Sequence, residues 1–183
     1  MQTVEIQYEY TTEVNRSKFL SYLIPISDYD GLQEALKAQH PKANHVVYAL
    51  RYLNEFEQIV ENFSDDGEPK GCAGMPALNV LRGEELINCA VLIVRYFGGI
   101  KLGTGGMARA YALAVKNVLK EANLIEYEKE CTYTFSTHYN EVDKTLHTLK
   151  KFGISDYERY FGMDSVEWKI IGSEEKIGMF KKL

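Results

Sequence analysis

Apolar positions along the first two thirds of the chain alternate between the spacing of strands and the spacing of helices. Runs of β-branched and aromatic residues predict five strands, at Thr3–Glu9, Phe19–Ile26, Val46–Leu53, Gln58–Phe63 and Leu86–Tyr96. The last run is almost continuously apolar, which is typical of a strand buried on both faces. These strands should form the framework of the first part of the chain.

Three helices are predicted among these strands. The first begins at the cap-like pair Ser27 and Asp30 and ends before Pro41. The second begins near Pro76, a residue suited to a first helical turn, and runs through Leu81. The third follows a cluster of glycines, and its apolar stripe consists of Met107, Tyr111, Val115, Val118 and Ala122. The resulting order is β-β-α-β-β-α-β-α.

A charged segment at Glu126–Glu130 marks a boundary between two predicted domains, residues 1–126 and 127–183. Beyond it the pattern predicts strands and helices in the order β-α-β-β-α, at Cys131–Thr137, Asn140–Phe152, Ile154–Phe161, Ser165–Ile171 and Ser173–Lys182. This order is one strand short of a ferredoxin-like split β-α-β unit. We therefore expect an α+β protein with two domains.

Composition narrows the class of protein. The chain has 183 residues, 45% hydrophobic and 26% charged, as in an ordinary globular protein. Its three cysteines are widely spaced, which argues against a disulfide scaffold or a zinc knuckle. The longest apolar run, Cys89–Val94, is far shorter than the roughly 20 residues that span a bilayer, and no secretory signal is present at the N-terminus. We expect a cytosolic (cytoplasmic) protein that does not contact membranes.

Charge is distributed unevenly along the chain. The net charge is −5, yet the segment Leu86–Lys120 contains no acid and five bases, Arg95, Lys101, Arg109, Lys116 and Lys120. The segment Asn44–Lys70 is acidic instead. Such asymmetry can create an anion-attracting face on an acidic protein, although the charges alone are better explained by solvated helix faces.

The acidic segment contains a short loop with three carboxylates, Asp65, Asp66 and Glu68. An Asp-Asp-Gly sequence favours a tight surface turn, which is the simplest interpretation. Alternatively, the carboxylates could hold a hard cation, with Asp65 and Asp66 as ligands of Mg²⁺, or accept a basic partner.

The glycine cluster lies between the last strand and the third helix, at Gly98, Gly99, Gly103, Gly105 and Gly106. Glycines permit turns that expose successive N–H groups, and a helix N-terminus adds partial positive charge. Thr104 is a candidate cap of the helix, and Arg95, Lys101 and Arg109 supply full charges. We predict a site for an anion, most simply a phosphate. The alternative is that the glycines only let the strand and helix pack closely.

Evidence for catalysis is weak. His45 is the one histidine that the expected topology places near the glycine cluster. No serine or cysteine is spaced to pair with a histidine and an acid, so nucleophilic catalysis has no support. We expect a binding protein without catalytic residues.

Two segments together carry a resemblance. Ser64–Pro76, with its Ser-Asp-Asp-Gly-Glu-Pro start, and Val94–Tyr111, with the glycine cluster, resemble the signatures of the YigZ/IMPACT family. Ser17–Phe19 and His45–Arg51 also fit that pattern, which adds His45 and Arg51 as accessory site residues. Two positions depart from it: Cys72 replaces the usual threonine, and Met75 stands where a basic residue is common.

The resemblance implies a first domain similar to the second domain of a small-subunit ribosomal protein, and a ferredoxin-like second domain similar to the last domain of elongation factor G. Eukaryotic members regulate translation initiation by competing for an activator of an initiation-factor kinase, and they carry an extra N-terminal module. We expect the bacterial type, without that module.

Three functional hypotheses follow. The first is a translation-associated protein whose glycine-rich basic loop contacts RNA phosphates or a ribosome-associated partner. The second is an enzyme or sensor for a small phosphorylated ligand, with Mg²⁺ at the acidic loop. The third is protein–protein regulation through that loop.

Overall fold

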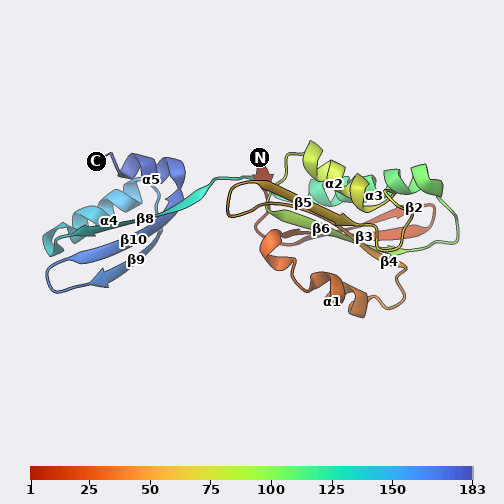
Figure 1. Cartoon of the computed structure of the whole chain (residues 1–183), viewed down its shortest axis with the longest axis horizontal. Coiled ribbons are helices and arrows are strands. Elements are labelled where there is room, and N and C mark those ends of the chain that lie inside the picture. Colours follow the sequence, from red (N-terminus) through yellow and green to blue (C-terminus); the bar gives the residue numbers. More distant parts are fainter. Residues whose placement is uncertain (183) are drawn as a thin grey trace. The chain divides into compact units, whose positions relative to one another are not determined.

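A computed structural model describes residues 1–182 (Figure 1). The chain divides into two compact units, Met1–Tyr127 and the residues from Glu128 onward. Both units combine antiparallel sheets with helices, so the predicted α+β class is confirmed. No helix within residues 1–182 has both the length and the apolar character needed to cross a bilayer.

The first unit is built on a five-stranded antiparallel sheet with the order β2-β3-β6-β4-β5. The strands are β2 (Tyr8–Val14), β3 (Ser17–Pro25), β4 (His45–Leu53), β5 (Ile59–Ser64) and β6 (Cys89–Tyr96). The apolar strand β6 lies in the centre, and it is buried from Cys89 through Arg95. The short strands β1 (Gln2–Thr3) and β7 (Ile125–Glu126) pair with each other.

Helices cover both faces of this sheet. Helices α2 (Gly74–Gly83) and α3 (Gly103–Glu121) pack on one face, and α1 (Leu32–Gln39) lies on the other (Figure 1). The alternation of strand β4 explains this division, because Val47 faces α2 and α3 whereas Val46 belongs to the cluster under α1.

Several predicted element ends are wrong. The first predicted strand, Thr3–Glu9, is interrupted, since β1 ends at Thr3 and β2 begins only at Tyr8. Ser27 lies in a 3₁₀ turn, η1 (Ile26–Asp28), and helix α1 is preceded instead by Gly31 at φ 77°. The predicted cap Thr104 lies inside the first turn of α3, where Leu102 occupies the N-cap position without a side-chain bond.

The second unit has the order β-α-β-β-α that the pattern predicts. Its elements are β8 (Glu130–Thr137), a 3₁₀ turn η2 (Tyr139–Glu141), α4 (Val142–Lys151), β9 (Asp156–Phe161), β10 (Val166–Ser173) and α5 (Glu174–Phe180). The sheet is antiparallel with β10 between β8 and β9. Trp168 fills its core, and the indole N–H donates to Thr137 Oγ1 at 2.9 Å.

The loop between β5 and α2 is shaped by the carboxylate of Asp65. Its two oxygens accept the backbone N–H groups of Gly71 (2.8 Å), Ala73 (3.1 Å) and Gly74 (2.8 Å). Gly74 is the first residue of α2, so Asp65 satisfies N–H groups at the start of that helix and closes the loop upon itself. The position of Glu68, three residues later, depends on this closure.

Replacing Asp65 with alanine should lower the free energy of unfolding by about 2 kcal/mol, the upper range for loss of a helix cap, because three N–H groups lose their acceptor. Urea denaturation measures the change. The control is Asp30→Ala, which removes an exposed carboxylate near α1 and should have almost no effect. Equal stability of the two variants would contradict the capping role.

Gly98 lies against the turn between β2 and β3. A Cβ atom at this position would be 2.0 Å from the backbone carbon of Arg16 and 2.4 Å from the nitrogen of Ser17. The Gly98 N–H also donates to Ser17 Oγ at 3.2 Å. The end of β6 is therefore held against the β2–β3 hairpin.

Replacing Gly98 with alanine should destabilise the protein by about 3 kcal/mol, because backbone atoms must move to admit the new methyl group. The control is Gly83→Ala at the end of α2, where nothing lies within 4 Å of an added Cβ. That variant should be neutral or slightly stabilised. Thermal unfolding of both proteins is the measurement, and an unchanged melting temperature for Gly98→Ala would refute the close approach.

Candidate functional site

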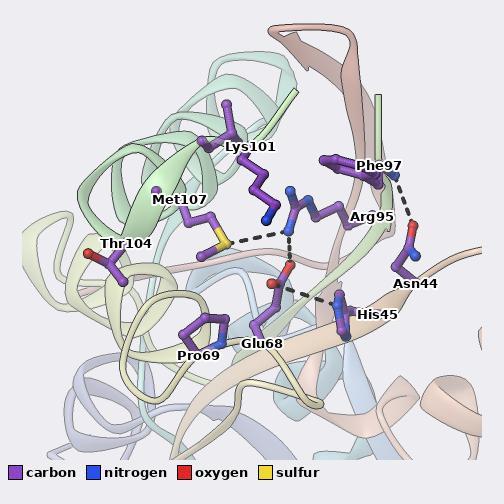
Figure 2. A pocket seen from close by; sticks show the side chains of 11 residues that line it. Asn44, His45, Glu68, Pro69, Arg95, Phe97, Lys101, Thr104 and Met107 are labelled. Atoms are coloured by element: carbon purple, nitrogen blue, oxygen red, sulfur yellow. Dashed lines mark hydrogen bonds and ion pairs between the residues drawn. The ribbon is translucent and has the colours of Figure 1, made fainter. Parts of the chain in front are cut away.

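A cavity of about 430 Å³ opens where β6 ends and α3 begins (Figure 2). The loop after β5 and the first residue of β4 complete its wall. The lining residues are Asn44, His45, Glu68, Pro69, Arg95, Phe97, Lys101, Leu102, Gly103, Thr104 and Met107. We call this cavity the β6–α3 pocket.

Arg95 is the central residue of the β6–α3 pocket and is 6% exposed. Its Nη1 donates to Glu68 Oε1 and approaches Met107 Sδ at 3.4 Å. The guanidinium carbon lies 5.6 Å from the centre of the Phe19 ring and 5.8 Å from that of Phe97. The buried Nε has no hydrogen-bond partner within residues 1–182. The guanidinium is thus held in place by one carboxylate and two rings, and its Nε–H group is left without an acceptor among the described residues.

Glu68 joins three elements at the floor of the pocket. Besides Arg95 it accepts the Tyr111 hydroxyl of α3 at 2.8 Å, and His45 Nε2 lies 3.7 Å from its second oxygen. Burial, followed by the nearby Glu68 carboxylate, raises the pKa of Tyr111, so the phenol stays protonated and donates. His45 Nδ1 is 2.7 Å from the carbonyl oxygen of Asp66. Every polar contact of Glu68 is therefore internal.

Positive charge exceeds negative charge in the pocket. Figure 2 shows the Lys101 side chain pointing toward the Arg95 guanidinium, and no carboxylate within residues 1–182 forms an ion pair with Lys101. Gly103 and Thr104 belong to the first turn of α3, whose first N–H groups have no intrahelical acceptor. Two cations and a helix N-terminus face one carboxylate, an arrangement that favours an anionic guest.

The structure gathers only part of the predicted anion site. Arg95, Lys101, Gly103 and Thr104 line the pocket, together with His45. Four predicted glycines and one predicted arginine do not line it: Gly98, Gly99, Gly105, Gly106 and Arg109. The N–H of Gly98 already has an acceptor, so it is not part of an open amide site. Ligand binding by the remaining residues stays a prediction.

The carboxylates expected to share a metal ion do not converge. Asp65 caps α2, and Asp66 accepts Lys37 Nζ at 2.6 Å and the N–H of Val46 at 2.7 Å. Glu68 turns inward instead. Across residues 1–182, no three histidine, cysteine or acidic side chains are grouped to hold a metal ion. The magnesium interpretation of the acidic loop therefore finds no support in the geometry.

Arg51 does not belong to the pocket, contrary to its expected accessory role. It pairs with Cys89 in the sheet register, at the opposite end of β6 from the His45–Arg95 pair. Its side chain donates to Glu61 at 2.9 Å and to the carbonyl of Leu86 at 2.7 Å. Hydrogen bonds from Arg82 and then Arg51 lower the pKa of Glu61. Arg51 is thus part of a separate structural ion-pair network.

Other residues in or next to the pocket carry no sequence signal for a site. Asn44 accepts the N–H of Phe97 through its side-chain oxygen at 2.9 Å, which fixes the start of the glycine-rich segment. Met107 and Tyr111 fit the apolar stripe of the third helix, yet Met107 contacts Arg95 and Tyr111 donates to Glu68. No local pattern marks Asn44 or Phe97, because their roles depend on strand pairing.

Known proteins resemble this chain over most of its length. The Impact N-terminal domain family model matches residues 15–119. IMPACT family member YvyE of Bacillus subtilis is 30% identical over 183 residues, with 98% of this chain and 83% of that protein covered. An IMPACT family member of Haemophilus influenzae is 41% identical over 122 residues, and the match spans 56% of its length.

One solved structure, described as a hypothetical protein, resembles the chain with a TM-score of 0.65 and 25% sequence identity. The match covers 98% of this chain and 88% of the solved one. Together with the family model, which covers more than half of the chain, these similarities agree with the two sequence signatures. The chain belongs to the IMPACT family, of which YigZ and YvyE are members.

Proposed function

We propose that this chain is a non-catalytic RNA-binding protein associated with translation, and that the β6–α3 pocket receives one phosphate of the RNA. The observation that supports this most is the convergence of Arg95 and Lys101 on one cavity, in which Glu68 is the one carboxylate among the lining residues. The phosphate would neutralise the positive charge of Arg95 and Lys101 that Glu68 alone does not balance.

The outer face of α3 carries further cations. Arg109, Lys116 and Lys120 are exposed, and none of them forms an ion pair within residues 1–182. With a rise of about 1.5 Å per residue, they lie about 10 Å and about 6 Å apart along the helix. A row of cations along one helix suits a chain of phosphates better than one free ion.

Membership of the IMPACT family supports the link to translation, since the eukaryotic members described above regulate initiation. The partner is then RNA or a ribosome-associated ribonucleoprotein, encountered in the cytosol. The family resemblance also implies that the first unit is related to a ribosomal-protein domain and that the second unit is ferredoxin-like. Both expectations are consistent with a partner in the translation apparatus.

A small phosphorylated ligand is the second candidate. The pocket volume of about 430 Å³ falls within the range of about 300–1,000 Å³ that is usual for small-molecule sites. This candidate does not use the cations of α3, so the two proposals differ in the residues on which binding depends.

RNA binding should weaken with salt, because each neutralised phosphate releases counterions. Replacing Lys101 with alanine should reduce the slope of log affinity against log salt by about 0.7–0.9, and Arg109→Ala should have a similar effect. The control is Lys18→Ala, an exposed lysine that alternates with Phe19 on β3 and so points to the sheet face opposite the pocket. Fluorescence anisotropy with a structured RNA that also contains an unpaired loop measures the slopes. Salt-independent binding, or none, would count against the proposal.

Replacing Glu68 with glutamine should destabilise the protein by about 3 kcal/mol, because Arg95 loses its buried counter-charge. The same change raises the positive charge of the pocket, so phosphate should stabilise this variant more than the wild type. Melting temperatures in phosphate and in chloride at equal ionic strength test both effects. Glu61→Gln, which breaks two ion pairs away from the pocket, should respond to phosphate like the wild type. Equal phosphate responses in all three proteins would contradict an anion site.

A further inference from the structure

Phe97 presents an aromatic ring at the mouth of the β6–α3 pocket. The side chain is 46% exposed and lines the cavity, and the Arg95 guanidinium lies 5.8 Å from the ring centre. Its backbone is fixed by the hydrogen bond to Asn44. The ring is therefore supported from the protein side by a cation while much of its surface remains open to solvent (Figure 2).

Arg95 can be reached only by a group that enters the pocket. The residue is 6% exposed, and its guanidinium carbon lies within 5.8 Å of the ring centres of both Phe19 and Phe97. In an A-form duplex the bases are paired and stacked inside the helix, whereas unpaired bases can splay out and stack on an aromatic side chain. A ligand that places a phosphate on Arg95 and its base against Phe97 must therefore be unpaired.

We propose that the β6–α3 pocket recognises an unpaired nucleotide, with its phosphate on Arg95 and Lys101 and its base stacked on Phe97. This inference rests on the proposed function and adds the class of ligand. Stacking on an aromatic ring tolerates every base, because each base has a π face, and a guanidinium behind the ring adds to the interaction. The pocket would therefore distinguish single-stranded from double-stranded RNA, but it would not discriminate between base sequences.

The proximity of the two subsites supports this assignment. One residue separates Arg95 from Phe97 in the chain, and the Arg95 guanidinium already lies over the Phe97 ring. A phosphate bound to the guanidinium therefore places its own nucleoside beside the ring. An exposed ring with no cationic pocket behind it would offer no such pairing of a charged and an aromatic contact.

The test compares a single-stranded RNA of eight nucleotides with the same sequence in a duplex, using fluorescence anisotropy at several salt concentrations. Phe97→Ala should weaken single-strand binding roughly 5- to 150-fold, the effect of losing one base stack. The salt slope should not change, because no phosphate contact is lost. Phe97→Trp should restore affinity to within about twofold of the wild type.

Two controls separate stacking from structural damage. Phe56→Ala removes a ring that is 73% exposed in the loop between β4 and β5, and it should bind RNA like the wild type. The stabilisation of Phe97→Ala by inorganic phosphate should equal that of the wild type. A loss of this phosphate response together with RNA binding would show that the ring only supports Arg95, which would overturn the stacking proposal.

The remaining outcomes distinguish this inference from the proposed function. Equal affinity for single strand and duplex, or no effect of Phe97→Ala, would refute the unpaired-nucleotide inference and leave RNA binding intact. Failure of the wild type to bind either RNA would refute the proposed function itself. Competition by a nucleoside 5′-monophosphate identifies the source of the nucleotide: displacement of RNA with comparable affinity indicates a free nucleotide, and weak displacement indicates a nucleotide within a strand.

Discussion

The buried ion pair between Glu68 and Arg95 is the interaction on which the site depends. It joins a loop residue to a strand residue 27 positions later, and the Tyr111 hydroxyl brings in helix α3, 43 positions beyond Glu68. A charge buried this deeply is unstable without its partner, so the loop, strand and helix must be in place together. The first unit therefore has one arrangement of these three elements in which the pocket exists.

Such a pair contributes less to stability than to organisation. Desolvation of both ions offsets much of their attraction, and an apolar pair of similar shape would hold the elements together at least as well. What the ion pair adds is a guanidinium whose orientation is fixed near two aromatic rings before any ligand arrives. An anion that enters the pocket has little side-chain freedom left to remove, which is the usual advantage of a preorganised site.

The fold was largely predictable from periodicity, while the element ends and the partners of individual charges were not. The apolar run around β6 and the helical stripe of α3 identify both elements, because burial on two faces or one face leaves a direct trace in the sequence. The sequence pattern misplaces the start of α1, because Gly31 precedes the helix in a left-handed conformation and Ser27 resembles a cap nearby.

Arg95 is one of the residues of the predicted anion site and lines the pocket, but nothing in the sequence pairs it with Glu68. Three carboxylates in one tight turn suggested a common ion, yet a turn directs consecutive side chains apart. Asp65 bonds back to its own loop, Asp66 bonds to β4, and only Glu68 faces the pocket.

The glycines of the signature have separate structural tasks, and their combined effect is to bring Lys101 back over Arg95. Gly98 permits contact with the β2–β3 hairpin, which fixes where β6 ends. Gly99 and Gly103 have φ angles of 84° and 68°, values that other residues adopt only with strain, so the chain can reverse on both sides of Lys101. Because of this reversal, the Lys101 side chain points back toward Arg95 of β6, and α3 begins at the pocket wall. A glycine-rich segment of this kind acts through the path of the backbone: it places a cation and a helix N-terminus beside a buried arginine, and the anion preference follows from that placement.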